Sequence, residues 1–184
     1  MESSLPMVLE RIYLRPLEEK DLERVRMLSG DPDCSWATRP ITYPESVQSA
    51  SSWLDEHITM TKKGKSVSLA VVLRDQDLFI GSVLLFLEPL HQRAEIGCWI
   101  GRPYWSRGYG TEACAGAIHH GFEVLRLHKV SAYCVSTNTG SLKMLAKLGM
   151  KWEGCLREHL KIRGCFEDLL VYGLLAEERT TAGF

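Results

Sequence analysis

The bend at 101–113 combines residue types that can bind a phosphate group. Gly108 and Gly110 let the main chain approach a ligand closely and adopt conformations that other residues avoid. If a helix begins here, its first N–H groups and the positive end of its dipole suit a pyrophosphate. Arg107 could add a charge-assisted hydrogen bond. A G-x-G turn also occurs in tight strand-to-helix connections without a ligand, so the bend alone leaves both interpretations open.

Two other phosphate-binding loops do not fit the sequence. The chain has no G-x-x-x-x-G-K-[ST] segment, so a Walker-type nucleotide site is unsupported. Ala113 stands where a G-x-G-x-x-G fingerprint would have its last glycine, and no acidic ribose-binding strand follows. A Rossmann dinucleotide site is therefore also unsupported.

A carboxylate lies in the segment just before the bend. Residues 94–100 alternate between apolar and other side chains, which is the two-residue period of a strand, and Glu95 lies on the face opposite Ala94 and Ile96. Glu95 could take a proton from a reacting group, or it could be a solvated or ion-paired strand carboxylate. The sequence favours neither role over the other.

The hydrophobic period predicts the elements that position these residues. Strands are predicted at 11–16, 67–73, 78–87, 94–100, 130–135, 152–160 and 165–175, and helices at 22–28, 47–58, 111–125 and 138–148. A capping box is predicted at 42–45, Asn138 is a candidate N-cap, and Gly149 is a natural helix stop. This order predicts an α+β fold, in which helices wrap a mostly antiparallel sheet of about seven strands.

Composition narrows the class of protein. The 184 residues are 45% hydrophobic and 24% charged, which fits one soluble domain, and the net charge of −1 argues against nucleic-acid binding. Neither a signal peptide nor a membrane span is predicted, because the apolar runs are too short. The six cysteines stand singly, which favours free thiols in the cytoplasm. No metal site is predicted, since the adjacent His119 and His120 would diverge on a helix.

Five segments in order resemble the GNAT superfamily of N-acetyltransferases, and more closely its RimJ- and RimL-like branch of ribosomal-protein N-acetyltransferases. They are 94–100, 105–113, 138–141, 148–154 and 168–172. The resemblance covers nearly the whole chain and implies a single GNAT domain over 1–184, with its core at about 11–177. It also implies that acetyl-CoA lies in a V-shaped gap between the splayed strands 94–100 and 130–135.

The resemblance further implies which residues contact acetyl-CoA. The thioester would pair with strand 94–100 as an added strand, and the main chain of the bend would hold the pyrophosphate. The cofactor-binding residues implied are Cys98, Trp99, Ile100, Trp105, Ser106, Arg107, Gly108, Tyr109, Gly110, Thr111, Asn138 and Ser141. Asn138 would contact the pantetheine or hold the splay, although it could equally be only an N-cap.

In the mechanism that the resemblance implies, the acceptor amine attacks the thioester directly, so no enzyme nucleophile is required. Glu95 is the candidate general base, acting directly or through water, and main-chain N–H groups near 97–99 would stabilise the oxyanion. Many members protonate the leaving thiolate with a Tyr that follows the Asn-bearing segment. This chain has no Tyr between Tyr133 and Tyr172, so Ser141 or a water molecule is the candidate acid.

Several alternatives concern the acceptor. An α-amino group has a pKa near 8 and a lysine side chain about 10.4, a difference of roughly 3 kcal/mol in exposing the neutral amine. This favours a protein N-terminal α-amine, but small amines, amino acids and amine-bearing antibiotics remain open.

The roles of several other residues also remain open. Trp36, Tyr43 and Trp53 lie where the family closes over its acceptor, or they pack in the core. Glu112 either complements the helix dipole or contacts substrate. An acyl-CoA-binding sensor without turnover, and a homodimer, also remain open.

Overall fold

The strands and helices follow the hydrophobic pattern of the sequence. The computed structural model describes residues 5–29, 47–162 and 164–179, without the side chains of 47–49. Its strands are β1 (Met7–Val8), β2 (Ile12–Pro16), β3 (Ser66–Leu73), β4 (Leu78–Glu88), β5 (Arg93–Ile100), β6 (Lys129–Val135), β7 (Lys151–Ile162) and β8 (Cys165–Leu175). Its helices are α1 (Leu22–Ser29), α3 (Val47–Lys62), α4 (Tyr109–Glu123) and α5 (Thr139–Lys147). Each predicted strand and helix is confirmed, whereas the capping box, Trp36 and Tyr43 lie outside the described residues.

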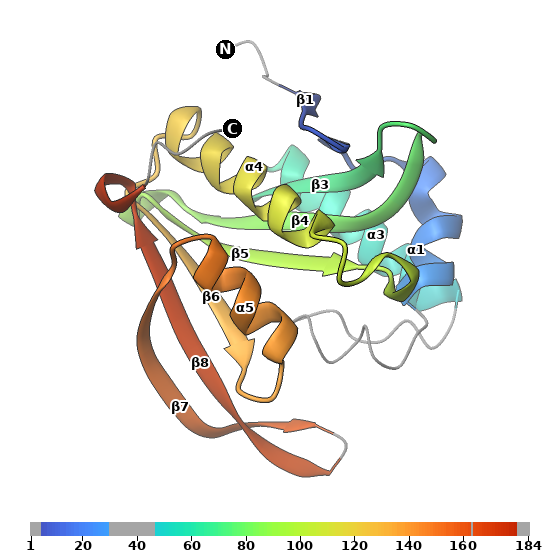
Figure 1. Ribbon diagram of the computed structural model, residues 1–184. Coiled ribbons are helices and arrows are strands. Elements are labelled where there is room, and N and C mark those ends of the chain that lie inside the picture. Colours follow the sequence, from blue (N-terminus) through green and yellow to red (C-terminus); the bar gives the residue numbers. More distant parts are fainter. Residues whose placement is uncertain (1–4, 30–46, 163, 180–184) are drawn as a thin grey trace.

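The strands in the described part of the chain all belong to one sheet, in the order β1-β2-β3-β4-β5-β6-β8-β7 (Figure 1). Every neighbouring pair is antiparallel except β5 and β6, which are parallel. The predicted mostly antiparallel sheet is therefore confirmed. Among the described residues it has eight strands instead of about seven, because β1 spans only two residues and is too short to show a period in the sequence.

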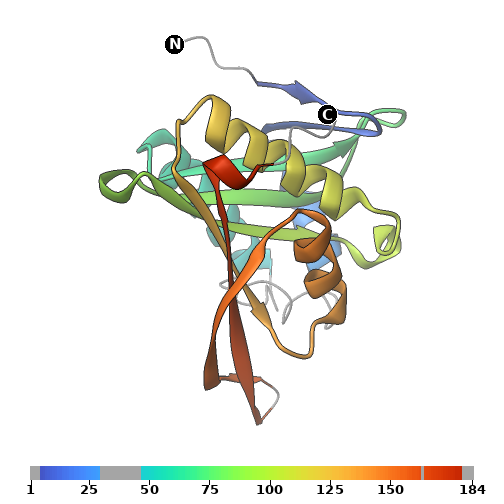
Figure 2. The same ribbon diagram turned by 60° about the vertical axis from the view of Figure 1, so that its left-hand side comes forward.

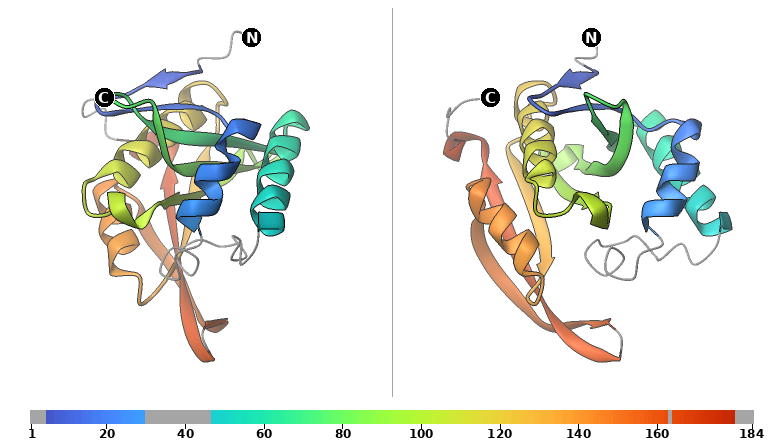
Figure 3. Two further views of the ribbon diagram at one scale, coloured as in Figure 1. Left: turned by 90° about the vertical axis from the view of Figure 1, so that its right-hand side faces the viewer. Right: turned by 45° about the vertical axis from the view of Figure 1, so that its right-hand side comes forward.

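Helices cover both faces of the sheet. Figure 3 shows α4 on one face and α1 with α3 on the other. Two hydrophobic cores result, one beneath α4 that includes Ile96 and Phe122, and one beneath α1 and α3 that includes Leu54 and Trp99. Because β5 is covered on both faces, Trp99 is only 4% exposed although it alternates with the apolar residues of the strand. Packing on both faces therefore holds β5, which borders the candidate site, in one position.

The hairpin of β7 and β8 projects away from the rest of the molecule (Figure 2). Its strands are long, and large apolar side chains on them are exposed, Trp152 and Phe166 each by 62%. The inner part of β8 pairs with β6 from Lys129 to Val135. Strand β8 of the hairpin therefore holds β6 in place over the whole length of β6.

Candidate functional site

Strands β5 and β6 pair only at their first residues. Residues 93–95 of β5 face residues 129–131 of β6, and the pairing ends there. Beyond that point β5 continues beside β4 up to Ile100, whereas β6 continues beside β8 up to Val135. The two strands diverge from this end of the sheet, as Figure 1 shows. The V-shaped gap that the family resemblance implied is therefore present.

A pocket of about 40 Å³ opens in this gap. Strands β5 and β6 and helices α4 and α5 line it, with Glu95, Ile96, Gly97, Cys98, Cys114, Ala132, Tyr133, Cys134, Ser141, Met144, Leu145 and Leu148. The structure thus brings Glu95 and Ser141, the two predicted catalytic residues, to one pocket. A volume of this size admits a group of a few heavy atoms, so a larger ligand would extend along the gap outside it.

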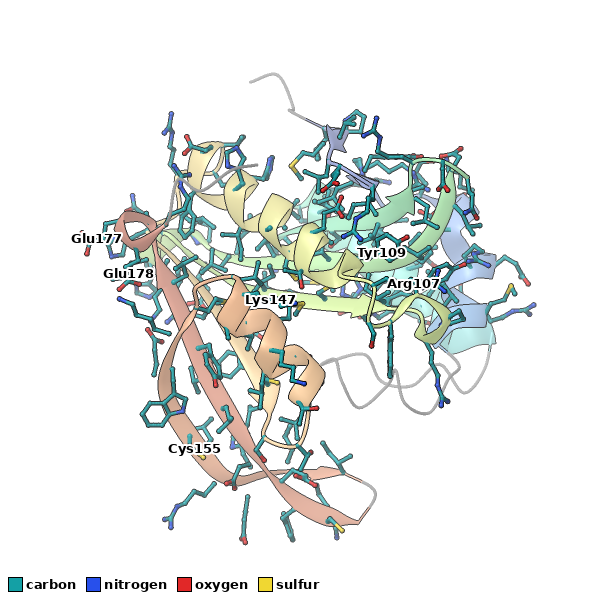
Figure 4. The ribbon with its side chains drawn as sticks, in the orientation of Figure 1. Arg107, Tyr109, Lys147, Cys155, Glu177 and Glu178 are labelled. Carbon is teal, nitrogen blue, oxygen red and sulfur yellow. The ribbon has the colours of Figure 1, made fainter. Side chains whose placement is uncertain are left out.

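The bend between β5 and α4 presents main-chain donors. Ser106 and Gly108 have left-handed backbone angles, with φ of 60° and 84°, and α4 begins directly after Gly108. Within the described part of the chain, no group accepts a hydrogen bond from the N–H groups of 108–111. Residues 105–108 are exposed, and Figure 4 labels Arg107 and Tyr109 at this end of α4. These donors and the helix dipole can hold an anion.

The bend adjoins the pocket. A Cβ atom added at Gly110 would lie 3.4 Å from Met144 Sδ and 3.6 Å from Ile100 Cγ1. Met144 also lines the pocket, so the start of α4 lies beside the end of β5 and the wall formed by α5. In addition, Trp105 Nε1 donates a hydrogen bond of 2.5 Å to the carbonyl of Ile100 and ties the bend to β5. A single ligand could therefore reach both the bend and the pocket.

Asn138 caps helix α5. Its Oδ1 atom accepts a hydrogen bond of 3.0 Å from the N–H of Ser141, and its carbonyl accepts one of 3.1 Å from the N–H of Leu142. The predicted N-cap is therefore confirmed. Asn138 does not line the pocket, whereas Ser141 does, so the cap orients the turn that carries Ser141.

Replacing Asn138 with Ala should destabilise the protein by about 1 kcal/mol, because the cap of α5 is lost. The KM for acetyl-CoA should rise several-fold, since the Ser141 turn would no longer be fixed. Urea denaturation and initial rates measure the two effects, and Thr139→Ala, at the exposed next position, is the control. A higher KM without any loss of stability would instead indicate direct contact between Asn138 and the cofactor.

Three thiols line the pocket, at Cys98, Cys114 and Cys134. Burial raises the pKa of Cys134 to about 11. A hydrogen bond with Cys98, and then burial, raise the pKa of Cys114 well above its usual value. Because the thiolate is the nucleophilic form, Cys114 and Cys134 are inert near neutral pH. This agrees with a reaction that needs no enzyme nucleophile.

The raised pKa values predict the order of alkylation. Iodoacetamide at pH 8 should label the exposed Cys165 well before the buried Cys114 and Cys134. Labelling of Cys134 in the folded protein should accelerate only as the pH approaches 11, where its thiolate forms. Peptide mapping by mass spectrometry reads each site, and the unfolded protein in urea is the control. Equal rates at all three sites in the folded protein would contradict the described burial.

Tyr133 is a pocket residue that was not among the predicted site residues. It lies on β6, is 37% exposed, and lines the pocket together with Glu95. Ser131 pairs with Glu95, so strand alternation places Tyr133 on the same side of the sheet as Glu95. The alternation was visible in the sequence, but the register between β5 and β6 was not.

Two further residues have contacts that clarify their earlier interpretation. The side chain of Trp99 packs in the core beneath α1 and α3, so only its main chain could face a ligand in the gap. Glu112 accepts hydrogen bonds from the main-chain N–H groups of Arg11 and Ile12, at 2.7 and 3.2 Å. Glu112 therefore links α4 to β2 and is not among the residues that line the pocket.

Neither a metal-binding cluster nor a membrane-spanning helix is found among the described residues. No cluster of three or more His, Cys, Asp or Glu side chains among them could hold a metal ion. In the same part of the chain, no helix combines the length and apolarity needed to cross a membrane.

The divergence of β5 and β6, with a pocket beside the N-terminus of α4, is the arrangement that the resemblance to acetyltransferases implied. A family model described as an acetyltransferase (GNAT) domain matches residues 11–151. The chain belongs to the GNAT acetyltransferase family, which confirms the predicted fold and enzyme class.

Similar proteins agree over nearly the whole chain. An uncharacterised N-acetyltransferase of Bacillus licheniformis is 29% identical over 170 residues, covering 92% of this chain and 95% of that protein. Spermidine N(1)-acetyltransferase of Escherichia coli is 28% identical over 176 residues, covering 92% and 91%. The solved structure of Mycobacterium smegmatis RimJ in complex with CoA-disulfide has the same fold, with a TM-score of 0.82 and 24% identity, covering 97% of this chain and 91% of that one.

Proposed function

We propose that this acetyltransferase transfers the acetyl group of acetyl-CoA to a protein N-terminal α-amine, by direct attack in a ternary complex. The observation that carries the proposal is the gap between β5 and β6, with Glu95 and Ser141 in its pocket. The bend before α4 adjoins the same pocket and offers main-chain donors to a diphosphate. One extended acetyl-CoA molecule would occupy both.

Each part of the gap has a role in this proposal. The N–H groups of 108–111 bind the diphosphate, and β5 beyond Glu95 pairs with the pantetheine chain. Glu95 accepts the proton that the amine loses as its nitrogen bonds to the thioester carbon. The C–S bond then breaks, and the thiolate is protonated by the hydroxyl of Ser141 or Tyr133 or by water, since both side chains line the pocket.

The charge of the pocket supports an α-amine as the acceptor. Glu95 is the only carboxylate among the described residues that line the pocket, so one cationic or neutral amine fits better than a chain of several cations. An α-amine with a pKa near 8 also loses its proton more easily than an alkylamine with a pKa of about 10.4. A polyamine is the second candidate, because the spermidine N(1)-acetyltransferase is similar over 92% of this chain.

The thiols support a cytoplasmic location for the enzyme. The described cysteines are all free, and free thiols persist in a reducing compartment. They are Cys98, Cys114, Cys134, Cys155 and Cys165.

An acceptor panel tests the proposed reaction. Release of free CoA thiol from acetyl-CoA should be faster with short peptides that have a free N-terminus than with the same peptides blocked at the N-terminus. Faster release with spermidine than with any peptide would favour the polyamine alternative. Calorimetric binding of CoA without acceptor-dependent thiol release would favour a sensor, and would contradict the proposed reaction.

A further inference from the structure

The side chain of Arg11 contacts the bend from outside the gap. Its Nη1 atom donates a hydrogen bond of 2.7 Å to the carbonyl of Arg107, 96 residues later in the chain. Its Nε and Nη2 atoms each lie 2.8 Å from Oε2 of Glu112, and its guanidinium lies 4.9 Å from the centre of the Tyr109 ring. One side chain thus holds three residues around the start of α4.

The bond to Arg107 also fixes the direction of the next N–H group. The C=O and N–H groups of a trans peptide point in opposite directions in one plane. The carbonyl of Arg107 points toward Arg11, so the N–H of Gly108 points away from it. Arg11 also lies directly beneath Gly108, because a Cβ atom added there would be 3.2 Å from Arg11 Nη2. The peptide between Arg107 and Gly108 is therefore held in one orientation.

The charge of Arg11 has a second effect. The Glu112 side chain is only 11% exposed and lies in the first turn of α4, where its negative charge opposes a bound diphosphate. The guanidinium of Arg11 neutralises that charge with two donors in a fork. Loss of the Arg11 side chain would release the peptide, and Glu112 would keep only its main-chain hydrogen bonds, without a cationic partner.

We propose that Arg11 is a positioning residue for the diphosphate of CoA: it orients the peptide that presents the Gly108 N–H and cancels the charge of Glu112. This role rests on the proposed function, because it assigns the bend to the diphosphate. This role predicts that replacing Arg11 weakens the binding of ligands that have the diphosphate, and does not slow reaction of a thioester that lacks it. Arg11 itself lines no part of the pocket among the described residues.

Arg11→Gln should raise the calorimetric Kd of CoA and the KM for acetyl-CoA about tenfold, the usual scale for a lost charge-assisted contact. The kcat/KM for S-acetylpantetheine, which has no diphosphate, should be unchanged with any amine that the enzyme accepts. Arg11→Lys, which keeps the charge but not the fork, should give an intermediate Kd for CoA.

Arg74→Gln is the matched control. Arg74 Nη1 donates hydrogen bonds of 2.8 Å to the carbonyls of Leu9 and Glu10, so it holds the turn before Arg11 without touching the bend. The Arg74→Gln variant should keep the wild-type kcat/KM for both acetyl donors, acetyl-CoA and S-acetylpantetheine. If Arg11→Gln lowers kcat/KM equally for acetyl-CoA and S-acetylpantetheine, or leaves the Kd of CoA unchanged, the positioning role is refuted. Failure of a peptide acceptor leaves the CoA affinities measurable, whereas absence of CoA binding by the wild type would refute both proposals.

Discussion

Gly108→Val is expected to raise the Kd of acetyl-CoA by at least about tenfold, because two effects combine there. Gly108 has φ of 84°, which a β-branched residue adopts only with strain. The new Cβ atom would also lie 3.2 Å from Nη2 of Arg11, so the guanidinium that holds the bend would have to shift by a few tenths of an ångström. Isothermal titration calorimetry with acetyl-CoA measures the change directly.

Gly64→Val separates loss of binding from general strain. Gly64 has φ of 67° and open space around it, and it follows α3, well away from the bend in the sequence. The control should therefore lose a similar amount of stability without losing affinity for acetyl-CoA. If Gly108→Val folds and binds acetyl-CoA as the wild type does, the bend does not hold the diphosphate, and the proposed cofactor path is wrong.

Glu95→Gln should lower kcat by about a hundredfold, the lower range for loss of a general base. The Kd of CoA should be nearly unchanged, because the proposed cofactor contacts on β5 come from its main chain. The pH dependence of kcat should also change, because the bound complex would have lost its proposed general base. Initial rates from pH 5 to 10 with a peptide acceptor test both effects.

Glu88→Gln is the control for strand carboxylates near the site. Glu88 ends β4 and pairs with Arg93 at 2.7 Å, and it does not line the pocket. The control should keep both the rate and the pH profile of the wild type. A wild-type pH profile in Glu95→Gln would remove Glu95 from the mechanism and leave it the strand carboxylate that the sequence also allowed.

Local patterns predicted the elements but not how they meet. The alternation in 94–100 predicted strand β5, yet it did not show that Trp99, on the face opposite Ala94 and Ile96, is buried. The cause is tertiary: α1 and α3 cover that face, and no period within β5 can reveal them. Likewise, the point where β5 and β6 separate is a matter of register between segments far apart in sequence. Only the family resemblance indicated the gap in advance.

The candidate site shows the same division. The bend was found because Gly108 and Gly110 are adjacent to a predicted helix, so its signal is local. Tyr133 was missed because its place in the pocket depends on the register of β6 against β5. The contacts of Arg11 were also out of reach, since they join residues nearly a hundred positions apart. Long-range contacts of this kind leave no trace in a single sequence.

The early end of pairing between β5 and β6 also has a consequence for stability, if acetyl-CoA binds along β5 as proposed. A cofactor that pairs with β5 binds the native chain and not the denatured one. The free energy of unfolding therefore increases with the cofactor concentration. At a hundred times its Kd, acetyl-CoA would contribute about 2.7 kcal/mol. The melting temperature of the enzyme would then rise with the concentration of acetyl-CoA.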